Sequence, residues 1–219
     1  MGMSGTQPGR NARLVGAAGA VAALLFIALF RLKRLGPLDF WDWLSLNIVF
    51  VAAMSFFLDR GYARRLREDL GSGLARKAVL GIASAAALYG VFAVGRIVAL
   101  RIFPFAAAGI GHVYALKAGT PVLRIVLLIG LVIGPGEELF WRGFFQERTG
   151  ATTSPVLGFA LTALLYTAVH MASGNLMLVL AAAVCGVFWG WLYLRFRSPV
   201  LNIVSHTLWD LAVFVVFPF

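Results

Sequence analysis

Residues 122–145 read VLRIVLLIGLVIGPGEELFWRGFF, and this stretch decides what kind of fold the chain adopts. It is apolar and long enough to cross a bilayer, since a helix of about 20 residues spans the hydrocarbon core. Yet it carries two adjacent acids, Glu137 and Glu138, with Arg142 one helical turn further on. Charged groups at that depth are costly and usually line a cavity or contact a partner. The stretch therefore predicts a membrane helix that carries a functional site.

The rest of the chain has the same apolar character. Hydrophobic residues make up 61% of the 219 residues, charged residues make up 13%, and the mean hydropathy is +0.88. A soluble domain has roughly 45–50% apolar and 25% charged residues. We therefore expect an all-α, polytopic transmembrane bundle of about seven to eight spans. The seven full spans are Leu14–Phe30, Phe40–Leu58, Ala78–Leu100, Val122–Phe145, Pro155–Ala172, Leu176–Leu194 and Pro199–Phe217.

These spans divide the single membrane domain into two parts. Residues 1–121 hold the N-terminal spans and the charged loop 59–77, which we expect to be a solvated cytoplasmic segment with a surface helix. Residues 122–219 hold the helices that carry the catalytic-looking residues. The apolar stretch Ile102–Tyr114 is too short for a full span, so it is expected to be re-entrant or interfacial and could make an eighth element.

The basic residues indicate an orientation. The net charge is +10, but Lys and Arg lie mostly in short stretches between spans, as topology signals do, so no nucleic-acid partner is expected. Eleven lie on the side of the N-terminus and five on the other, which predicts a cell-membrane protein with a cytoplasmic N-terminus. The eleven are Arg10, Arg13, Arg60, Arg64, Arg65, Arg67, Arg76, Lys77, Arg148, Arg195 and Arg197, and the five are Arg31, Lys33, Arg34, Arg101 and Lys117.

Two patterns suggest packing rather than chemistry. Four tryptophans fall toward the ends of predicted spans, which is typical of interfacial anchors. Two pairs of glycines four residues apart indicate close helix contacts. The tryptophans are Trp41, Trp43, Trp189 and Trp191, and the glycine pairs are Gly130 with Gly134 and Gly186 with Gly190.

The glutamate motif separates two roles. Glu138 and Arg142 are four residues apart in the favourable order, so they can pair on one helix face. Glu137 projects about 100° away and is free for another role. Gly134-Pro135-Gly136 precedes them as a helix breaker, and we expect a freed backbone turn that lines a cavity. The plain alternative is an acid pair that only neutralises Arg142.

Two more polar pairs follow on later spans. Tyr166 and His170 share a face of the fifth span, and His206 and Asp210 repeat the same spacing in the seventh. Either histidine alone is also explained as a hydrogen-bonded packing residue. Together with the glutamates they supply a base, a water holder and a charge stabiliser in a water-poor bundle, as hydrolysis requires.

In this order on successive apolar segments, the three motifs resemble the CAAX-protease and bacteriocin-processing family, the glutamic-type intramembrane proteases that include type II CAAX prenyl endopeptidases. The resemblance covers about residues 122–217. It implies an endopeptidase that cuts near the C-terminus of a membrane-anchored or lipidated protein or peptide. It assigns the general base to Glu137, water holding to His170, and the oxyanion-stabilising positions to His206 and Asp210. Supporting roles fall to Glu138, Arg142 and Tyr166.

Two positions depart from the family pattern. Tyr166 stands where the family usually has Phe, and Asp210 stands where it often has Asn. An ionised aspartate would repel an oxyanion, whereas a protonated one can donate to it. Alternatively, an ionised Asp210 favours a charged His206, which then supplies the stabilisation. Both readings stay open.

Other functions fit less well. The sequence has no His-Glu-xx-His and no Gly-x-Ser-x-Gly motif. Glu137, His170, His206 and Asp210 could ligate a metal, but we expect neither a metal nor a cofactor. Cys185 is the only cysteine, so cysteine-based metal sites are excluded. The competing classes are a non-enzymatic immunity or binding protein of the same fold and a proton-coupled carrier.

One geometric conflict remains. If the fourth span ends at Phe145 and the fifth begins at Pro155, straight helices at 1.5 Å per residue place Glu137 and His170 about 10 Å or more apart in height. A later boundary or the break at Gly134–Gly136 must close this gap if the two residues act together.

Overall fold

The computed structural model describes residues 8–219, and almost all of this part of the chain is helical, with no strand. The prediction of an all-α, polytopic helical bundle is confirmed. The main helices are α1 Pro8–Leu32, α2 Phe40–Leu58, α3 Tyr62–Gly71, α4 Leu74–Ile102, α5 Ala106–Ala115, α9 Pro155–His170, α10 Leu176–Phe196 and α11 Pro199–Leu211. Six helices are long and apolar enough to cross a membrane, and their candidate spans begin at Ala12, Phe40, Leu74, Pro155, Leu176 and Pro199.

The fourth predicted span, Val122–Phe145, takes a composite form. Residues 122–152 are helical without interruption but alternate between α-helical and π-helical segments, so no one segment reaches the length of a span. We call this run the central helix. Its segments are α6 Val122–Leu128, η1 Ile129–Ile133, α7 Gly134–Glu138, η2 Leu139–Gln146 and α8 Glu147–Thr152.

Polar residues followed by proline set the starts of two site helices. Ser154 accepts a hydrogen bond from the N–H of Leu157 and thereby caps α9, and Ser198 accepts from Leu201 and caps α11. Proline follows each serine at the first helical position, where its missing N–H costs nothing. These two Ser-Pro pairs fix the register of the helices that carry the second and third motifs.

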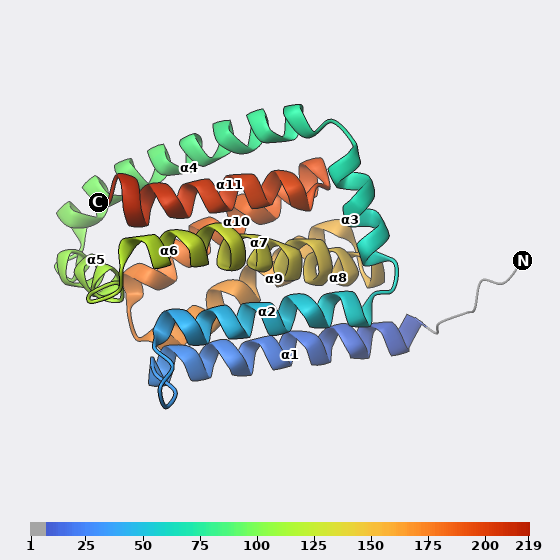
Figure 1. The fold of residues 1–219 in the computed structure, drawn as a ribbon, viewed down its shortest axis with the longest axis horizontal. Helices are drawn as coiled ribbons and strands as arrows, with labels where there is room; N and C mark the ends of the chain where they lie inside the picture. Colours follow the sequence, from blue (N-terminus) through green and yellow to red (C-terminus); the bar gives the residue numbers. More distant parts are fainter. Residues whose placement is uncertain (1–7) are drawn as a thin grey trace, which may run out of the picture.

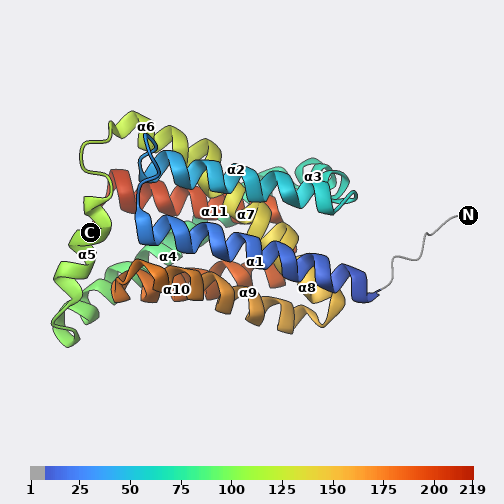
Figure 2. The same cartoon turned by 90° about the horizontal axis from the view of Figure 1, so that it is seen from below.

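The central helix runs through the middle of the bundle. In Figure 1, α1 and α2 lie on one side of it and α11 and α4 on the other. Figure 2 shows α9 and α10 on the face opposite α2 and α6. The helix α4 packs on α11, while much of its remaining surface is exposed apolar side chain. The polar motifs therefore lie at the centre of an apolar bundle.

Short helices lie at the two ends. Figure 1 shows α3 across the end where α1 begins and α5 at the opposite end. The helix expected in the loop 59–77 is present as α3, but its first residue is not a surface residue. Tyr62 is 1% exposed, and its hydroxyl donates to the carbonyl of Leu139 at 2.7 Å. Most of the predicted segment Ile102–Tyr114 lies in α5, which begins at Ala106 and is only 10 residues long, in agreement with the expectation of a short element.

The glycine predictions are confirmed at three of four positions. A Cβ on Gly190 would lie 2.8 Å from the Phe159 ring, and one on Gly186 would lie 3.2 Å from the Tyr166 ring. Gly134 is in similarly tight contact with Thr207. Gly130 has open space beside it, so the packing role expected there is wrong.

Candidate active site

The central helix accommodates Pro135 without a break. A proline ring crowds the carbonyl four residues earlier, so a regular α-helix would kink there. The preceding turn is π-helical instead, since Gly134 N–H donates to the carbonyl of Ile129 five residues back. This wider turn leaves room for the ring. The prediction of a freed backbone turn at Gly134–Gly136 is therefore wrong. Glu137 and Glu138 enter the bundle on a continuous helix.

Continuation of this helix also resolves the conflict in height. The helix ends at Thr152, not at Phe145, and α9 begins at Pro155. Glu137 lies 15 residues before Thr152, and His170 lies 15 residues after Pro155, so antiparallel helices bring the two to about the same level. The predicted end of the fourth span at Phe145 was seven residues too early.

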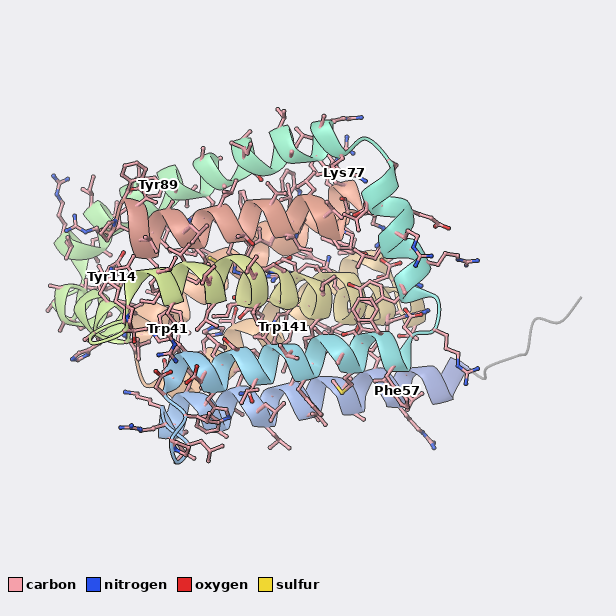
Figure 3. The ribbon with its side chains drawn as sticks, viewed as in Figure 1. Trp41, Phe57, Lys77, Tyr89, Tyr114 and Trp141 are labelled. Carbon is pink, nitrogen blue, oxygen red and sulfur yellow. The ribbon has the colours of Figure 1, made fainter. Side chains whose placement is uncertain are left out.

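Glu137 is buried and hydrogen-bonded to the second motif. Its side chain is 6% exposed, and its Oε2 accepts a hydrogen bond from the Tyr166 hydroxyl at 3.0 Å. The Tyr166 ring is itself fixed between aromatic and cationic neighbours. Trp141, in the bundle interior in Figure 3, meets it edge-on at 5.4 Å, and the Arg142 guanidinium lies 4.8 Å from its centroid. Tyr166 thus holds one oxygen of Glu137 in place.

His170 presents one free nitrogen. Its Nδ1 lies 2.7 Å from the carbonyl oxygen of Tyr166. A carbonyl oxygen can only accept, so Nδ1 must carry a proton. In a neutral ring the lone pair is then on Nε2, which can accept a hydrogen bond from water. The Phe30 and Tyr166 rings lie 4.9 Å from the His170 ring and fix its orientation.

Glu138 is the centre of a buried polar network. Its Oε1 accepts from Arg142 Nη1 at 2.8 Å and from His206 Nδ1 at 2.7 Å, and its Oε2 accepts from Asn202 Nδ2 at 3.0 Å. Neither Glu138 nor Arg142 is exposed at all. The predicted pair of Glu138 and Arg142 is confirmed. A charge without a partner at this depth would be strongly destabilising, so the network holds the central helix and α11 in one arrangement.

His206 connects this network to Asp210. Because its Nδ1 donates to Glu138, its Nε2 points toward Asp210, whose Oδ2 lies 3.5 Å away. That distance is too long for a strong hydrogen bond. The imidazole ring stacks on Trp189 with the centroids 3.6 Å apart. The orientation of His206 is therefore fixed on three sides, while the proton between Nε2 and Asp210 can reside on either group.

One cavity joins the three motifs. Its volume is about 390 Å³, and its walls are mostly apolar. All four residues predicted to be catalytic line it, together with Tyr166, whereas the supporting pair Glu138 and Arg142 lies behind the wall. The polar residues named above that line it are Glu137, Tyr166, His170, His206 and Asp210. The motifs that are far apart in the sequence thus share one mostly apolar space.

Sequence reasoning missed two residues of this site. Asn202 lies one turn before His206, so Asn202, His206 and Asp210 form a polar stripe on an apolar helix that the spacing could have revealed. Trp189 was expected to be an interfacial anchor, but it is fully buried and covers His206. That expectation is wrong because Trp189 lies well inside α10, where apolar flanks alone do not distinguish lipid from core.

The possible metal ligands do not converge in this arrangement. Within residues 8–219, no three His, Cys, Asp or Glu side chains come together in a group that could hold a metal ion. The carboxylate of Glu137 faces Tyr166, and His206 is engaged by Glu138.

Comparison with known protein families finds a similarity over part of the chain. Residues 118–212 match the family model described as type II CAAX prenyl endopeptidase Rce1-like. This segment is Rce1-like. It contains all three motifs and the cavity-lining residues that they supply, while α1 to α5 precede it. No curated protein and no solved structure matched the chain.

The family match indicates a general type of activity and not the roles of individual residues. The Rce1-like segment supports CAAX-type intramembrane protease activity, and with the apolar helices it makes this a multi-pass membrane protein. The resemblance expected from the motifs is thereby confirmed. The roles of the individual residues stay predictions.

Proposed function

We propose that this protein is a glutamate-dependent intramembrane endopeptidase that hydrolyses a peptide bond near the C-terminus of a membrane-anchored or lipidated substrate. The observation that carries the proposal is the common cavity of Glu137, His170, His206 and Asp210. A hydrolase needs a base, an oriented water molecule and a stabiliser for the oxyanion within reach of one reacting carbon. These four side chains offer all three.

The proposed reaction begins with a water molecule between Glu137 and Nε2 of His170. Glu137 takes one proton as the water oxygen attacks the scissile carbonyl carbon. The negative charge that develops on the carbonyl oxygen is stabilised by His206 and Asp210, through a proton held on either one. Glu137 then passes its proton to the amide nitrogen as the C–N bond breaks. The products are a new carboxyl terminus and a free amine.

The residues behind the cavity wall have a positioning role in this scheme. Glu138 receives hydrogen bonds from Arg142, His206 and Asn202, and this fixes the side of His206 that faces the cavity. Tyr166 donates to the Oε2 of Glu137. A water molecule must therefore be activated mainly by the other oxygen of that carboxylate.

We also propose that the protein lies in the cell membrane with its N-terminus in the cytoplasm. Arginine side chains are concentrated at the end of the bundle that carries α3, where positive charge favours the cytoplasm. Variants with one added cysteine test this orientation with a membrane-impermeant maleimide on intact cells. Ala118→Cys should be labelled and Ser72→Cys should not, with the wild type, whose Cys185 is buried, as background. The reverse pattern would reject the orientation.

The activity is tested first on membrane proteins in cells. Cells with the wild-type protein should contain membrane proteins that are cut near the C-terminus, and cells with Glu137→Gln should retain the uncut forms. Glu147→Gln is the matched control, because Glu147 pairs with Arg197 outside the cavity. An immunity or binding protein, or a proton carrier, would leave C-termini identical in all three strains, and that result would refute the hydrolase.

A further inference from the structure

The cavity contains one positive charge that the proposed reaction does not use. Arg96 is the only Lys or Arg among the described residues that line it. It belongs to α4, six residues before the end of that helix at Ile102. The helix is apolar and lies at the outside of the bundle, with 17% of its most apolar window buried. An ionisable residue within such a span usually has a functional partner.

No such partner is present within the chain. Among residues 8–219, no carboxylate lies within ion-pair distance of the Arg96 guanidinium, and no hydrogen bond joins it to another residue. Arg124, on the central helix, is by contrast neutralised, because it pairs with Asp39 at 2.7 Å and with Asp42 at 2.5 Å. Arg96 is exposed where it lines the cavity, and no group within residues 8–219 engages its donors. The group that suits these donors is an anion with planar oxygens, such as a carboxylate.

The packing of α4 on α11 gives the distance from the reacting groups. The two helices run in the same direction in Figure 1, and a Cβ on Gly81 would lie 2.7 Å from Val204. Asp210 lies six residues beyond Val204, whereas Arg96 lies fifteen beyond Gly81. The difference of nine residues is an offset of about 14 Å along the helix axes at 1.5 Å per residue. An extended peptide covers that distance with about four residues.

The direction of the Arg96 side chain shortens this offset somewhat. Side chains on a helix lean toward its N-terminus, so the Arg96 guanidinium would lie closer to Asp210 than its Cα does. Tyr114 and Trp41, which Figure 3 shows at the end of the bundle near α5, line the same part of the cavity. A chain that reaches from Asp210 to this region would therefore place its end beside Arg96.

We propose that Arg96 binds the α-carboxylate of the substrate, three or four residues beyond the bond that is cut. The substrate identity in this inference rests on the proposed function, but the binding step does not require turnover. Recognition of a free carboxyl terminus would make the protein select substrates by the distance from their end. It would also account for an unpaired arginine inside an apolar helix.

The experiment measures binding of matched peptides to purified protein in phosphatidylcholine nanodiscs. The probes are a peptide with a farnesylated cysteine followed by three residues and a free carboxylate, and the same peptide as a carboxamide. Trp41 and Trp209 line the cavity, so quenching of tryptophan fluorescence reports occupancy. All proteins carry Glu137→Gln to prevent cleavage. The variants compared are Arg96→Gln, Arg96→Lys and the control Arg101→Gln, which alters a neighbouring arginine of α4 that does not line the cavity.

The acid should bind about 10- to 100-fold more tightly than the amide to protein with Arg96, the range expected for a hydrogen bond to a charged group. Arg96→Gln should remove this preference without weakening amide binding, Arg96→Lys should keep part of it, and Arg101→Gln should keep it all. A preference that survives Arg96→Gln, or no preference in the parent, including no binding at all, would overturn the proposal.

A second arm separates the substrate carboxylate from a lipid phosphate. Nanodiscs with added phosphatidylglycerol should leave the preference for the acid in place. Loss of that preference in anionic lipid, together with bound phosphatidylglycerol that disappears in Arg96→Gln, would assign Arg96 to a headgroup instead and overturn the proposal. A protein that prefers the acid through Arg96 but cleaves neither peptide when Glu137 is restored would keep the carboxylate site and refute only the hydrolase.

Discussion

Replacement of Arg142 by methionine removes a cation from a place that solvent does not reach. Arg142 and Glu138 are both 0% exposed, and Nη1 and Oε1 are 2.8 Å apart. Loss of one partner of a buried pair costs about 3–5 kcal/mol of unfolding free energy, because the other charge stays buried. Glu138 retains hydrogen bonds from His206 and Asn202, which places the expected loss near the lower limit, about 3 kcal/mol.

The control for this change is an exposed pair of the same chemistry. Arg197 is 49% exposed and lies 2.9 Å from Glu147, so Arg197→Met should cost at most about 1 kcal/mol. The double variant Glu138→Gln, Arg142→Met removes the unpaired acid and should be more stable than Arg142→Met alone. Unfolding by SDS from mixed micelles, followed by tryptophan fluorescence, gives the three free energies. If Arg142→Met is no less stable than Arg197→Met, the central place of this pair in the bundle is refuted.

Three further predictions concern charge. Asp210→Asn should keep much of the parent rate of hydrolysis, because an amide donates a hydrogen bond at every pH. A rate as low as that of Asp210→Ala in folded, inserted protein, a loss of about 10- to 1,000-fold, would instead favour an ionised Asp210 that pairs with His206. Activity should persist after exhaustive chelation, and stoichiometric zinc whose removal and return switch the rate off and on would contradict this. Burial opposes ionisation of Asp59, but Arg148 and Arg65 outweigh it and hold the pKa of Asp59 below its usual range. Asp59→Asn should therefore be about 2 kcal/mol less stable at neutral pH. The difference should begin to shrink as the pH falls below 3.8, the usual pKa of the carboxyl, and should vanish only below the lower pKa of the folded state. An unfolding titration in which the gap persists at the lowest pH would argue against this.

The polar residues of the site could be found from the sequence because the bilayer makes them costly. Glu137, His170, His206 and Asp210 stand out in apolar spans, and each lines the cavity. Spacing alone also predicted the contact between Glu138 and Arg142. In a soluble protein the same residues would be hidden among many charged ones.

The relative heights of the site residues in the bundle, and the hydrogen-bond partners of polar residues, could not be found from the sequence. Hydropathy falls after Phe145, but the helix continues through Gln146, which is 2% exposed and donates to the carbonyl of Gly190 at 2.8 Å. A polar residue that is satisfied by a neighbouring helix resembles a loop residue in the sequence. The π-helical turn before Pro135 is hidden for a similar reason, since its hydrogen-bond pattern depends on packing around Gly134 and Gly136.

The burial of Trp189 depends on tertiary contacts as well. An apolar helix exposes one face to lipid and one to protein, and both faces have the same composition. Trp189 is 0% exposed whereas Trp191 is 52% exposed, although they are two residues apart. Only the position of His206 on the adjacent helix identifies the inner face.

The most direct measurement for the central claim is the rate of peptide hydrolysis by purified protein in nanodiscs, with Glu137→Gln beside the wild type and Glu147→Gln. The substrate is the farnesylated peptide acid described above, and its binding is measured in the same samples. If Glu137 activates the water, Glu137→Gln should bind the peptide normally and cleave it about 100- to 10,000-fold more slowly, the usual contribution of a general base. Cleavage by Glu137→Gln within threefold of the wild-type rate would contradict the account.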